Sequence, residues 1–327
     1  MSNRFVPVIH GAALDRPDEQ DTIDAAENVA RSLTGLGFAS EVITIGAELA
    51  ALDVLAERCP YVVFNLVEAL DGEAARAQYA VERLEALGVR YTGARAPAYL
   101  TSNGKLSSKS CFADHAIPTP AHWLAGETVP QGETVIVKSI DEHGSLGIDS
   151  NSVVAGEDAQ AEIARREARF GGRFFAEAFV DGREFNVSVI EARTGLVVLP
   201  IAEIDFDELP GEALHIVDYA AKWDPAAVSY HTTPRRFGLD KAEPHLAAEI
   251  RRLSLASWHA LGLAGYARVD FRVSRDGEVL VLEANANPCL APDAGFAAAA
   301  AEAGLSYDDV IAAIVDTTAH SWKVAQL

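Results

Sequence analysis

An Asp-Gly pair near the C-terminal end separates two polar-studded segments, 266–273 and 278–285. Asp-Gly at 276–277 is a strong signal for a two-residue turn between antiparallel strands. Counting back from this turn places four polar side chains on one face in two opposed pairs: Asp270 with Glu283, and Arg268 with Asn285. Directly opposed side chains lie about 5 Å apart at Cβ. The sequence therefore predicts a compact polar cluster on one face of a hairpin.

Asp270, Glu283 and Asn285 together offer an all-oxygen site for a hard divalent ion, and magnesium is the best match. Two carboxylates at this separation repel each other unless a cation lies between them. Arg268 could hold an anion beside the metal. Exposed Asp–Glu neighbours also occur on ordinary hairpins, and another loop length would break the register. The order Asp, then Glu-x-Asn, followed by Pro288, favours the metal site.

A second candidate site follows the predicted strand 135–140, where Lys138 precedes a loop of small residues at 143–147. Small residues let backbone N–H groups close around a phosphate, and a lysine supplies charge. Taken alone, the segment is better explained as a β-turn with a solvated lysine. Lys105, at the start of an amphipathic segment, gives no signal by itself.

A third candidate lies at 177–180, where Glu177-Ala178-Phe179-Val180 ends one predicted strand and Glu184 begins the next after Asp181-Gly182. Such an extended segment can offer backbone groups to a purine edge, and a carboxylate can bind ribose hydroxyls. In isolation, an ordinary hairpin with exposed acids is the favoured interpretation.

Composition excludes several classes of function. The chain has 327 residues, enough for two or three packed layers and more than one domain, and its formal net charge is −21. That charge disfavours nucleic-acid partners and anionic membrane surfaces. Three scattered cysteines are too few for a disulfide framework, and neither a signal peptide nor a spanning segment is evident, so we expect a cytoplasmic protein. Zinc-protease, nucleophile-elbow and dinucleotide fingerprints are lacking from the sequence.

Strands alternate with helices over the first ~95 residues, which predicts a small parallel sheet. The expected strands are 4–10, 41–45 and 61–66, and the expected helices are 18–36, 48–58 and 73–87. Beyond Pro97 we expect a helix within 102–115, strands at 135–140, 174–180, 184–191 and 196–204, helices at 159–170 and 243–261, a long functional loop at 205–236, and two closing helices within 296–319 around Gly304.

Taken in order, these motifs resemble an ATP-grasp enzyme, and most of all the D-alanine–D-alanine ligases. The likeness covers nearly the whole chain, and its most specific parts are Arg268-Val269-Asp270-Phe271 and Glu283-x-Asn285-x-Asn287-Pro288. The resemblance implies a fold of the α/β (α+β) class: a Rossmann-like parallel-sheet domain at 1–96, a small ATP-grasp subdomain with a flap loop at 97–180, and a C-terminal subdomain at 181–327, with ATP between the two subdomains.

The resemblance also implies roles for individual residues. Catalytic roles fall to Arg268, Lys222 and Ser145, and metal binding to Asp270, Glu283 and Asn285. The ion would be magnesium, as two ions, with manganese as the alternative. ATP would contact Lys105, Lys138, Gly144, Ser145, Gly147, Glu177, Phe179, Val180, Glu184, Lys222 and Leu282; substrates would contact Glu19, Glu68, Trp223, Cys289 and Asp293.

The chain departs from the family around the substrates. Gly144 stands where the family has a flap serine, Trp223 replaces a tyrosine, and Asp293 or Ala294 replaces a serine. We therefore expect an ATP-dependent ligase that joins a small-molecule carboxylate to an amine through an acyl phosphate, with an altered substrate shell. The alternatives are a genuine D-alanine–D-alanine ligase and a non-catalytic ATP-binding protein. Related ligases are often dimers, so the resemblance offers a homodimer by analogy alone.

Overall fold

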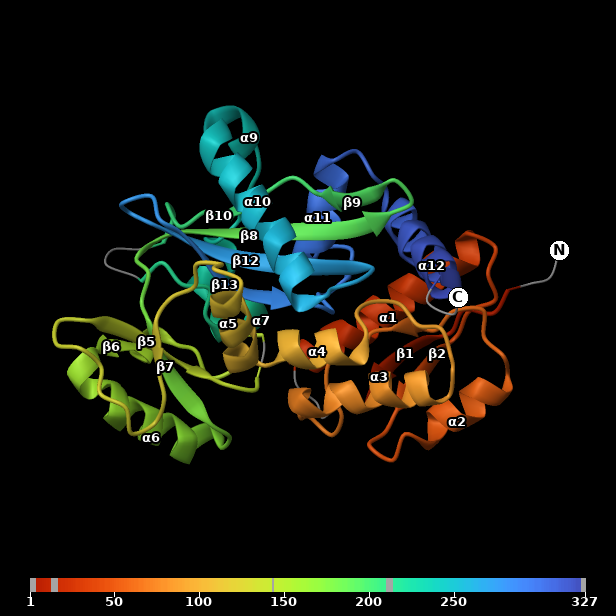
Figure 1. Cartoon of the computed structure of the whole chain (residues 1–327), viewed down its shortest axis with the longest axis horizontal. Coiled ribbons are helices and arrows are strands. Elements are labelled where there is room, and N and C mark those ends of the chain that lie inside the picture. Colours follow the sequence, from red (N-terminus) through yellow and green to blue (C-terminus); the bar gives the residue numbers. More distant parts are fainter. Residues whose placement is uncertain (1–3, 13–16, 143, 210–213, 325–327) are drawn as a thin grey trace.

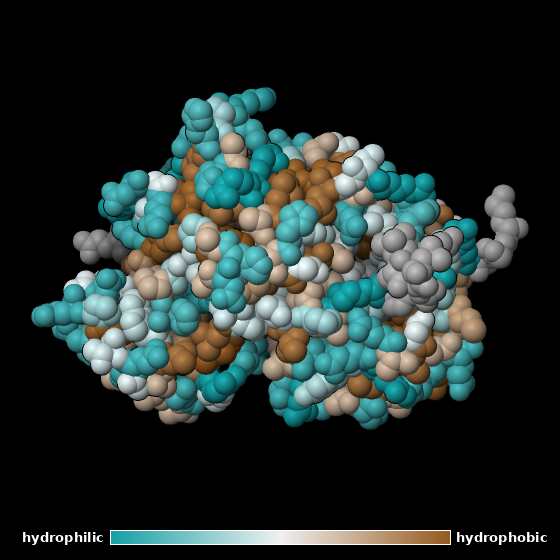
Figure 2. All heavy atoms as spheres, in the orientation of Figure 1, coloured by the Kyte–Doolittle hydropathy of each residue, from teal (hydrophilic) through white to brown (hydrophobic). Residues whose placement is uncertain are grey.

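A computed structural model of the chain describes residues 4–12, 17–142, 144–209 and 214–324. Three sheets organise these residues, and Figure 1 shows the largest above the other two. The face seen in Figure 2 is mixed: hydrophilic residues surround several hydrophobic patches, the largest of them in the upper half of the view. Within the described ranges, no helix is both long enough and apolar enough to cross a membrane.

The N-terminal sheet is parallel, as predicted, with strand order β2-β1-β3. Its strands are β1 (Val8–Gly11), β2 (Val42–Ile45) and β3 (Phe64–Asn65), which are shorter than the predicted segments. The helices are α1 (Pro17–Gly35), α2 (Ala50–Glu57) and α3 (Ala77–Ala86), the last preceded by a 3-10 turn, Ala74–Arg76. At the end of β1, a Cβ on Gly11 would lie 2.0 Å from the carbonyl oxygen of Ala69, so only glycine fits there.

The middle sheet is antiparallel, with strand order β4-β7-β5-β6. Its strands are β4 (His122–Trp123), β5 (Thr134–Ser139), β6 (Val153–Ala155) and β7 (Phe174–Ala178). Helix α6 (Ala159–Phe170) has the bounds predicted from the sequence and buries Ile163 against Val135 and Val137 of β5. This unit lies at the lower left of Figure 1.

The largest sheet has the order β11-β10-β8-β12-β13, with β9 paired to β8. Its strands are β8 (Gly182–Ala192), β9 (Gly195–Val198), β10 (Ala202–Ile204), β11 (Arg235–Arg236), β12 (Tyr266–Ser274) and β13 (Val279–Asn285). The helices are α4 (Ala96–Asn103), α5 (Lys105–Asp114), α7 (Tyr219–Trp223), α8 (Val228–His231), α9 (Leu239–Ala242), α10 (Pro244–Leu261), α11 (Gly295–Glu302) and α12 (Tyr307–Val324). Helices α4 and α5 pack against β13 of this sheet. The division at 96/97 and 180/181 stays a prediction.

The hairpin interpretation of Asp181-Gly182 is wrong. β7 and β8, the strands on either side of this dipeptide, belong to different sheets, so the chain passes here from one sheet to the other. A Cβ on Gly182 would lie 2.0 Å from the carbonyl oxygen of Val273, which explains the glycine by close packing against β12. The predicted long loop 205–236 contains the short elements α7, α8 and β11.

The β12–β13 register has the predicted pairs at its polar end, Asp270 with Glu283 and Arg268 with Asn285. The predicted two-residue tip is wrong. Ser274 N donates to Glu278 O at 2.9 Å around a three-residue loop whose last residue, Gly277, has a φ of 87°. Phe271 pairs with Val281 and Asp270 with Glu283, so Leu282 of β13 is an unpaired bulge residue. This bulge restores the predicted register. Two opposite one-residue shifts therefore cancel before the polar cluster.

Candidate active site

Two adjoining cavities lie where the sheets meet. The intersheet cavity lies between β5 and β7 of the middle sheet and β8, β12 and β13 of the largest sheet. The wide cavity extends from the same junction to the N-terminal sheet, where Gly11 and Ala69 line it. Residues that line both cavities mark the junction: Glu142, Gly144, Glu184, Val217, Lys222, Asp270 and Glu283.

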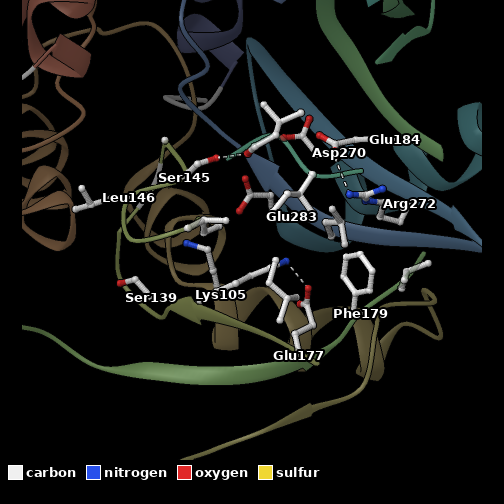
Figure 3. A pocket seen from close by; sticks show the side chains of 18 of the residues that line it. Lys105, Ser139, Ser145, Leu146, Glu177, Phe179, Glu184, Asp270, Arg272 and Glu283 are labelled. Atoms are coloured by element: carbon white, nitrogen blue, oxygen red, sulfur yellow. Dashed lines mark hydrogen bonds and ion pairs between the residues drawn. The ribbon is translucent and has the colours of Figure 1, made fainter. Parts of the chain in front are cut away.

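The intersheet cavity gathers most of the predicted nucleotide residues. Its lining includes Lys105, Lys138, Gly144, Ser145, Glu177, Phe179, Val180, Glu184, Lys222, Leu282, Asp270 and Glu283. In Figure 3, Lys105 and Glu177 face Glu283, Asp270 and Glu184 across the cavity. Gly147 does not line it, and its carbonyl instead accepts a hydrogen bond from Arg166. The bulge explains why the consecutive residues Leu282 and Glu283 both line the cavity.

Glu177 is the shared counter-ion of two lysines rather than an exposed acid. It is 2% exposed; its Oε1 accepts from Lys138 Nζ, and its Oε2 lies 2.6 Å from Lys109 Nζ. Burial alone would raise the pKa of Glu177, but the charges and hydrogen bonds of Lys138 and Lys109 lower it. This triad carries one net positive charge, which Lys138 presents to the intersheet cavity.

Two further lysines line the intersheet cavity from other elements, and one of them, Lys222, belongs to the junction. Lys105 opens α5 and donates to the carbonyl of Glu142, and burial lowers its pKa. Lys222 lies on α7, where burial and then the positive charge of Arg268 lower its pKa. The fold therefore holds several ammonium groups close together in a partly desolvated space. A polyanion there would offset the cost of charging them.

On β12 and β13, Asp270 is 7% exposed and is held by a bidentate pair with Arg268, whose Nε and Nη2 each lie 2.8 Å from a carboxylate oxygen. Asn186 Nδ2 on β8 donates to Asp270 Oδ1 at 2.9 Å. Burial by itself lowers the pKa of Arg268. The negative charge and hydrogen bonds of Asp270 outweigh this effect, so the pKa of Arg268 is raised overall. Asn285 Oδ1 accepts from the N–H of Asn287 at 2.9 Å.

The three predicted metal ligands are thus assembled on adjacent strands. Carboxylate and amide oxygens alone form this donor set, which suits magnesium. Across the described ranges, no group of three or more His, Cys, Asp or Glu side chains could hold a metal ion.

The loop 144–148 is closed against the segment 216–223. Ser145 Oγ donates to Val217 O at 2.8 Å, and Tyr219 N donates to Ile148 O at 3.2 Å. Trp223 Nε1 donates to Gly144 O at 3.0 Å. Gly144 has a φ of 65°, which favours glycine, and a Cβ there would lie 3.6 Å from the indole nitrogen. Trp223, which stands where the family has a tyrosine, therefore bonds to the backbone of residue 144. This contact requires no side chain at that position.

The wide cavity has charges of both signs on its walls. Asp21 and Glu68 line it together with Arg268 and Arg235, and Asp270, Glu283 and Asp293 add further carboxylates. Cys289 Sγ donates to Asp21 Oδ2 at 2.9 Å, and burial followed by the charges of Asp21 and Glu68 raises the thiol's pKa well above its usual value.

The predicted substrate residues Glu68, Trp223, Cys289 and Asp293 all line the wide cavity. The side chain of Glu19 lies outside the described residues, although its backbone belongs to α1. Asp21, two positions further along α1, lines the cavity instead.

Sequence reasoning missed several residues of the site. Lys109 lies one helical turn after Lys105, and that i, i+4 spacing was an available signal. Arg272 continues the alternation of Arg268 and Asp270, and it lies 3.3 Å from the Glu184 carboxylate in the intersheet cavity. Arg235 lies in the segment of weak periodicity and gave no comparable signal.

Comparison with known proteins gives consistent results. The family model described as D-ala D-ala ligase C-terminus matches residues 120–316. D-alanine–D-alanine ligase of Chromohalobacter salexigens is 32% identical over 287 residues, covering 84% of this chain and 82% of that protein. An uncharacterised Sinorhizobium fredii protein, y4sG, is 30% identical over 260 residues, covering 78% of this chain and 73% of that protein.

The fold agrees with these sequence matches. The ATP-complexed crystal structure of D-alanine–D-alanine ligase from Bacillus anthracis matches with a TM-score of 0.75 at 20% identity, covering 98% of this chain and 99% of that one. That likeness shows the ATP-grasp fold. Because the family model spans more than half of the chain and a relative exceeds 30% identity over most of both lengths, this protein belongs to the D-alanine–D-alanine ligase family, as an ATP-dependent ligase that forms carbon–nitrogen bonds.

Proposed function

We propose that this ligase activates the carboxylate of one amino-acid-like substrate with ATP and joins it to the amine of a second, with a substrate shell unlike that of enzymes that make D-alanyl-D-alanine. The observation that carries the proposal is the presence of both carboxylates and guanidiniums on the walls of the wide cavity. Asp21 and Glu68 can receive an ammonium group, while Arg268 and Arg235 can receive carboxylates. A molecule with both groups fits such a cavity better than a simple acid or amine does.

ATP takes the intersheet cavity in this proposal. Lys105, Lys138 and Lys222 face its phosphates, Gly144 and Ser145 cover them, and Phe179, Val180, Glu184 and Leu282 hold the nucleoside. Glu177 positions Lys138 through their ion pair. Asp270, Glu283 and Asn285 would hold magnesium, whose charge offsets the repulsion between phosphates and a substrate carboxylate.

The reaction has two steps. A carboxylate oxygen takes the γ-phosphoryl group and ADP leaves, which converts a poor acylating agent into an acyl phosphate. The amine nitrogen then attacks the carbonyl carbon, inorganic phosphate leaves and the amine loses a proton. The developing oxyanion is stabilised by Arg268 and the backbone N–H of Cys289. The contacts of Ser145 and Trp223 hold the loop 144–148 closed, which keeps water from the acyl phosphate.

The changed substrate shell supports a specificity other than D-alanine. Trp223 is bound to the backbone of Gly144, so a contact between a side chain and the backbone stands where the family has a tyrosine and a flap serine. Asp293 stands on the wall of the wide cavity, where a carboxylate would repel the carboxyl group of an acceptor unless a cation offsets it. The family's own activity with D-alanine fits the shared architecture equally well and remains the alternative.

Product analysis tests the proposal. The purified protein is incubated with ATP, magnesium and pooled D-, L- and β-amino acids, and ADP, phosphate and amide products are measured by coupled assay and mass spectrometry. We expect ADP release that depends on one carboxylate–amine pair, with matching amide. D-alanyl-D-alanine as the main product would establish the alternative. Nucleotide binding with no ADP formation in any mixture would make the chain a non-catalytic ATP-binding protein.

We further infer a cytoplasmic location, because the substrate ATP and the free thiols of Cys59, Cys111 and Cys289 suit a reducing compartment. A homodimer, by analogy with related ligases, is tested by light scattering on the purified chain.

A further inference from the structure

Arg235 lies on the edge strand β11, where it is exposed to solvent on one side and lines the wide cavity. Its Nη1 lies 3.3 Å from the backbone carbonyl oxygen of Asp293. It does not line the intersheet cavity and is not among the junction residues. The cation therefore lies in a part of the wide cavity that is not shared with the proposed nucleotide site.

The chain makes room for this side chain. A Cβ on Gly295 would lie 3.2 Å from Arg235 Nε, which is tighter than most such contacts. Residue 294, beside it, is alanine, and both small residues line the same wall. A larger residue at 295 would push the guanidinium away, so the glycine and the arginine form a matched pair.

The charge of Arg235 is poorly balanced by the protein. Among the described residues, no carboxylate oxygen lies within 4.0 Å of its guanidinium. Its neighbour Arg236 faces the other way and pairs with Asp205 and with Asp207, the latter at 3.0 Å. Burial and then the positive charge of Arg268 lower the pKa of Arg235, and Asp293 offsets this only in part. Because Arg268 is already paired with Asp270, Arg235 is the guanidinium of the wide cavity that can bind an additional anion.

We propose that Arg235 binds the carboxylate of the second, amine-bearing substrate and so selects amino acids over simple amines. The inference rests on the proposed function, because it assigns a group within the same cavity. The donor carboxylate must meet the transferring phosphoryl group at the junction, near Lys222 and Asp270. Arg235 lies outside the junction, against Asp293 and Gly295, so we assign the acceptor to that part of the wide cavity. A planar guanidinium can bind a carboxylate through two parallel hydrogen bonds.

Kinetics of Arg235→Gln and Arg235→Lys test the proposal, with Arg236→Gln as the matched control on the same strand. Glycine, D-alanine, L-alanine and β-alanine are each compared with their primary amides as acceptor, alongside the pooled donors. We expect wild-type protein to prefer acid over amide, and Arg235→Gln to raise the acceptor KM about 10- to 100-fold while leaving the ATP KM within about 2-fold. The preference for acid should collapse in Arg235→Gln, be partly kept in Arg235→Lys and be intact in Arg236→Gln. Thermal unfolding confirms that the variants fold.

Equal use of acid and amide by wild-type protein, or equal acceptor KM values for the Gln variants at 235 and 236, would overturn the inference. If no pair turns over, the proposed function fails, and equilibrium binding of the same four acids to protein saturated with a non-hydrolysable ATP analogue decides the point. Binding that is lost in Arg235→Gln and kept in Arg236→Gln supports the site. Binding that is absent in wild type, or equal in both variants, rejects it.

Discussion

Trp223 Nε1 donates a hydrogen bond to the backbone carbonyl of Gly144 at 3.0 Å, linking α7 to the loop that covers the intersheet cavity. Trp223→Phe keeps an aromatic ring and removes the donor. A hydrogen bond of this kind contributes about 1 kcal/mol net, so the loop should open about 5-fold more often. We expect more ATP hydrolysis per amide formed, measured as the ratio of phosphate to product. Trp123→Phe, on β4 and outside both cavities, is the control. An unchanged ratio in Trp223→Phe would show that this bond does not exclude water.

Lys109 stabilises the fold and positions Lys138 without lining either cavity itself. Lys109→Met leaves Glu177 with one cation and removes bonds to Thr119 Oγ1 at 2.8 Å and Pro120 O at 3.1 Å. Breaking such a buried pair costs about 3–5 kcal/mol. We expect a fall of this size in the free energy of unfolding, measured in urea, and an increased KM for ATP.

The double variant Lys109→Met with Glu177→Gln is the companion test. It removes the uncompensated carboxylate, so it should be less destabilised than the sum of the two single variants. Additive losses would mean that the two side chains stabilise the protein independently.

Nucleotide binding should take up protons at alkaline pH. The pKa values of Lys105 and Lys222 are lowered by burial, so in the free protein these lysines begin to lose their protons below the ordinary value of 10.5. Bound phosphates favour the charged forms and raise those pKa values. Uptake therefore begins near the lowered pKa of the free protein, ends above the raised pKa of the complex, and vanishes at lower pH.

Calorimetry in buffers of different ionisation enthalpy measures this uptake. Lys222→Met should reduce the number of protons taken up, whereas Lys241→Met, exposed on α9, should not. A proton count that stays near zero up to pH 10 would contradict the idea.

The lowered pKa values of Lys105 and Lys222 should also affect how the stability of the nucleotide-free protein depends on pH. Between the lowered pKa of the folded protein and the ordinary value of 10.5, the unfolded chain binds more protons than the folded one, so these lysines make the stability rise with pH toward 10.5. Lys222→Met should flatten that rise in urea titrations at pH 8 to 10. An unchanged slope would show that Lys222 has an ordinary pKa.

Glu283→Gln tests the proposed metal ligands. With one carboxylate removed, magnesium should no longer strengthen ATP binding, so the affinity difference between magnesium and EDTA should shrink by about 10-fold or more. Fluorescence titration with a labelled nucleotide reports that difference. Glu278→Gln, at the exposed end of the hairpin, is the control and should behave as wild type. Equal metal dependence in Glu283→Gln would place the ion elsewhere.

Much of the fold could be predicted because its signals are local. The alternation of strands and helices before residue 95 gave the parallel sheet, and helix α6 has its predicted bounds. The pairs Asp270–Glu283 and Arg268–Asn285 were predicted correctly although the tip was wrong, because the three-residue loop and the bulge at Leu282 shift the register in opposite directions.

The rest depends on packing between distant segments. Asp181-Gly182 looks like a hairpin turn in sequence, and only the partners of β7 and β8 show otherwise. Glu177 looked like an exposed acid because its partner Lys109 is 68 positions away in the sequence. Arg235 meets the wall at Asp293–Gly295 only through the tertiary fold, and no local pattern could have indicated that contact.

The passage of the chain from β7 to β8 has a mechanical consequence. The middle sheet is joined covalently to the rest of the protein at two short places, before β4 and after β7. Bending at these two connections would separate Lys138 from Asp270 and Glu283. It would break no hydrogen bond within the middle sheet or within the largest sheet. A bound triphosphate that contacts both sheets would then stabilise the closed arrangement of the middle and the largest sheet until its terminal phosphate has been transferred.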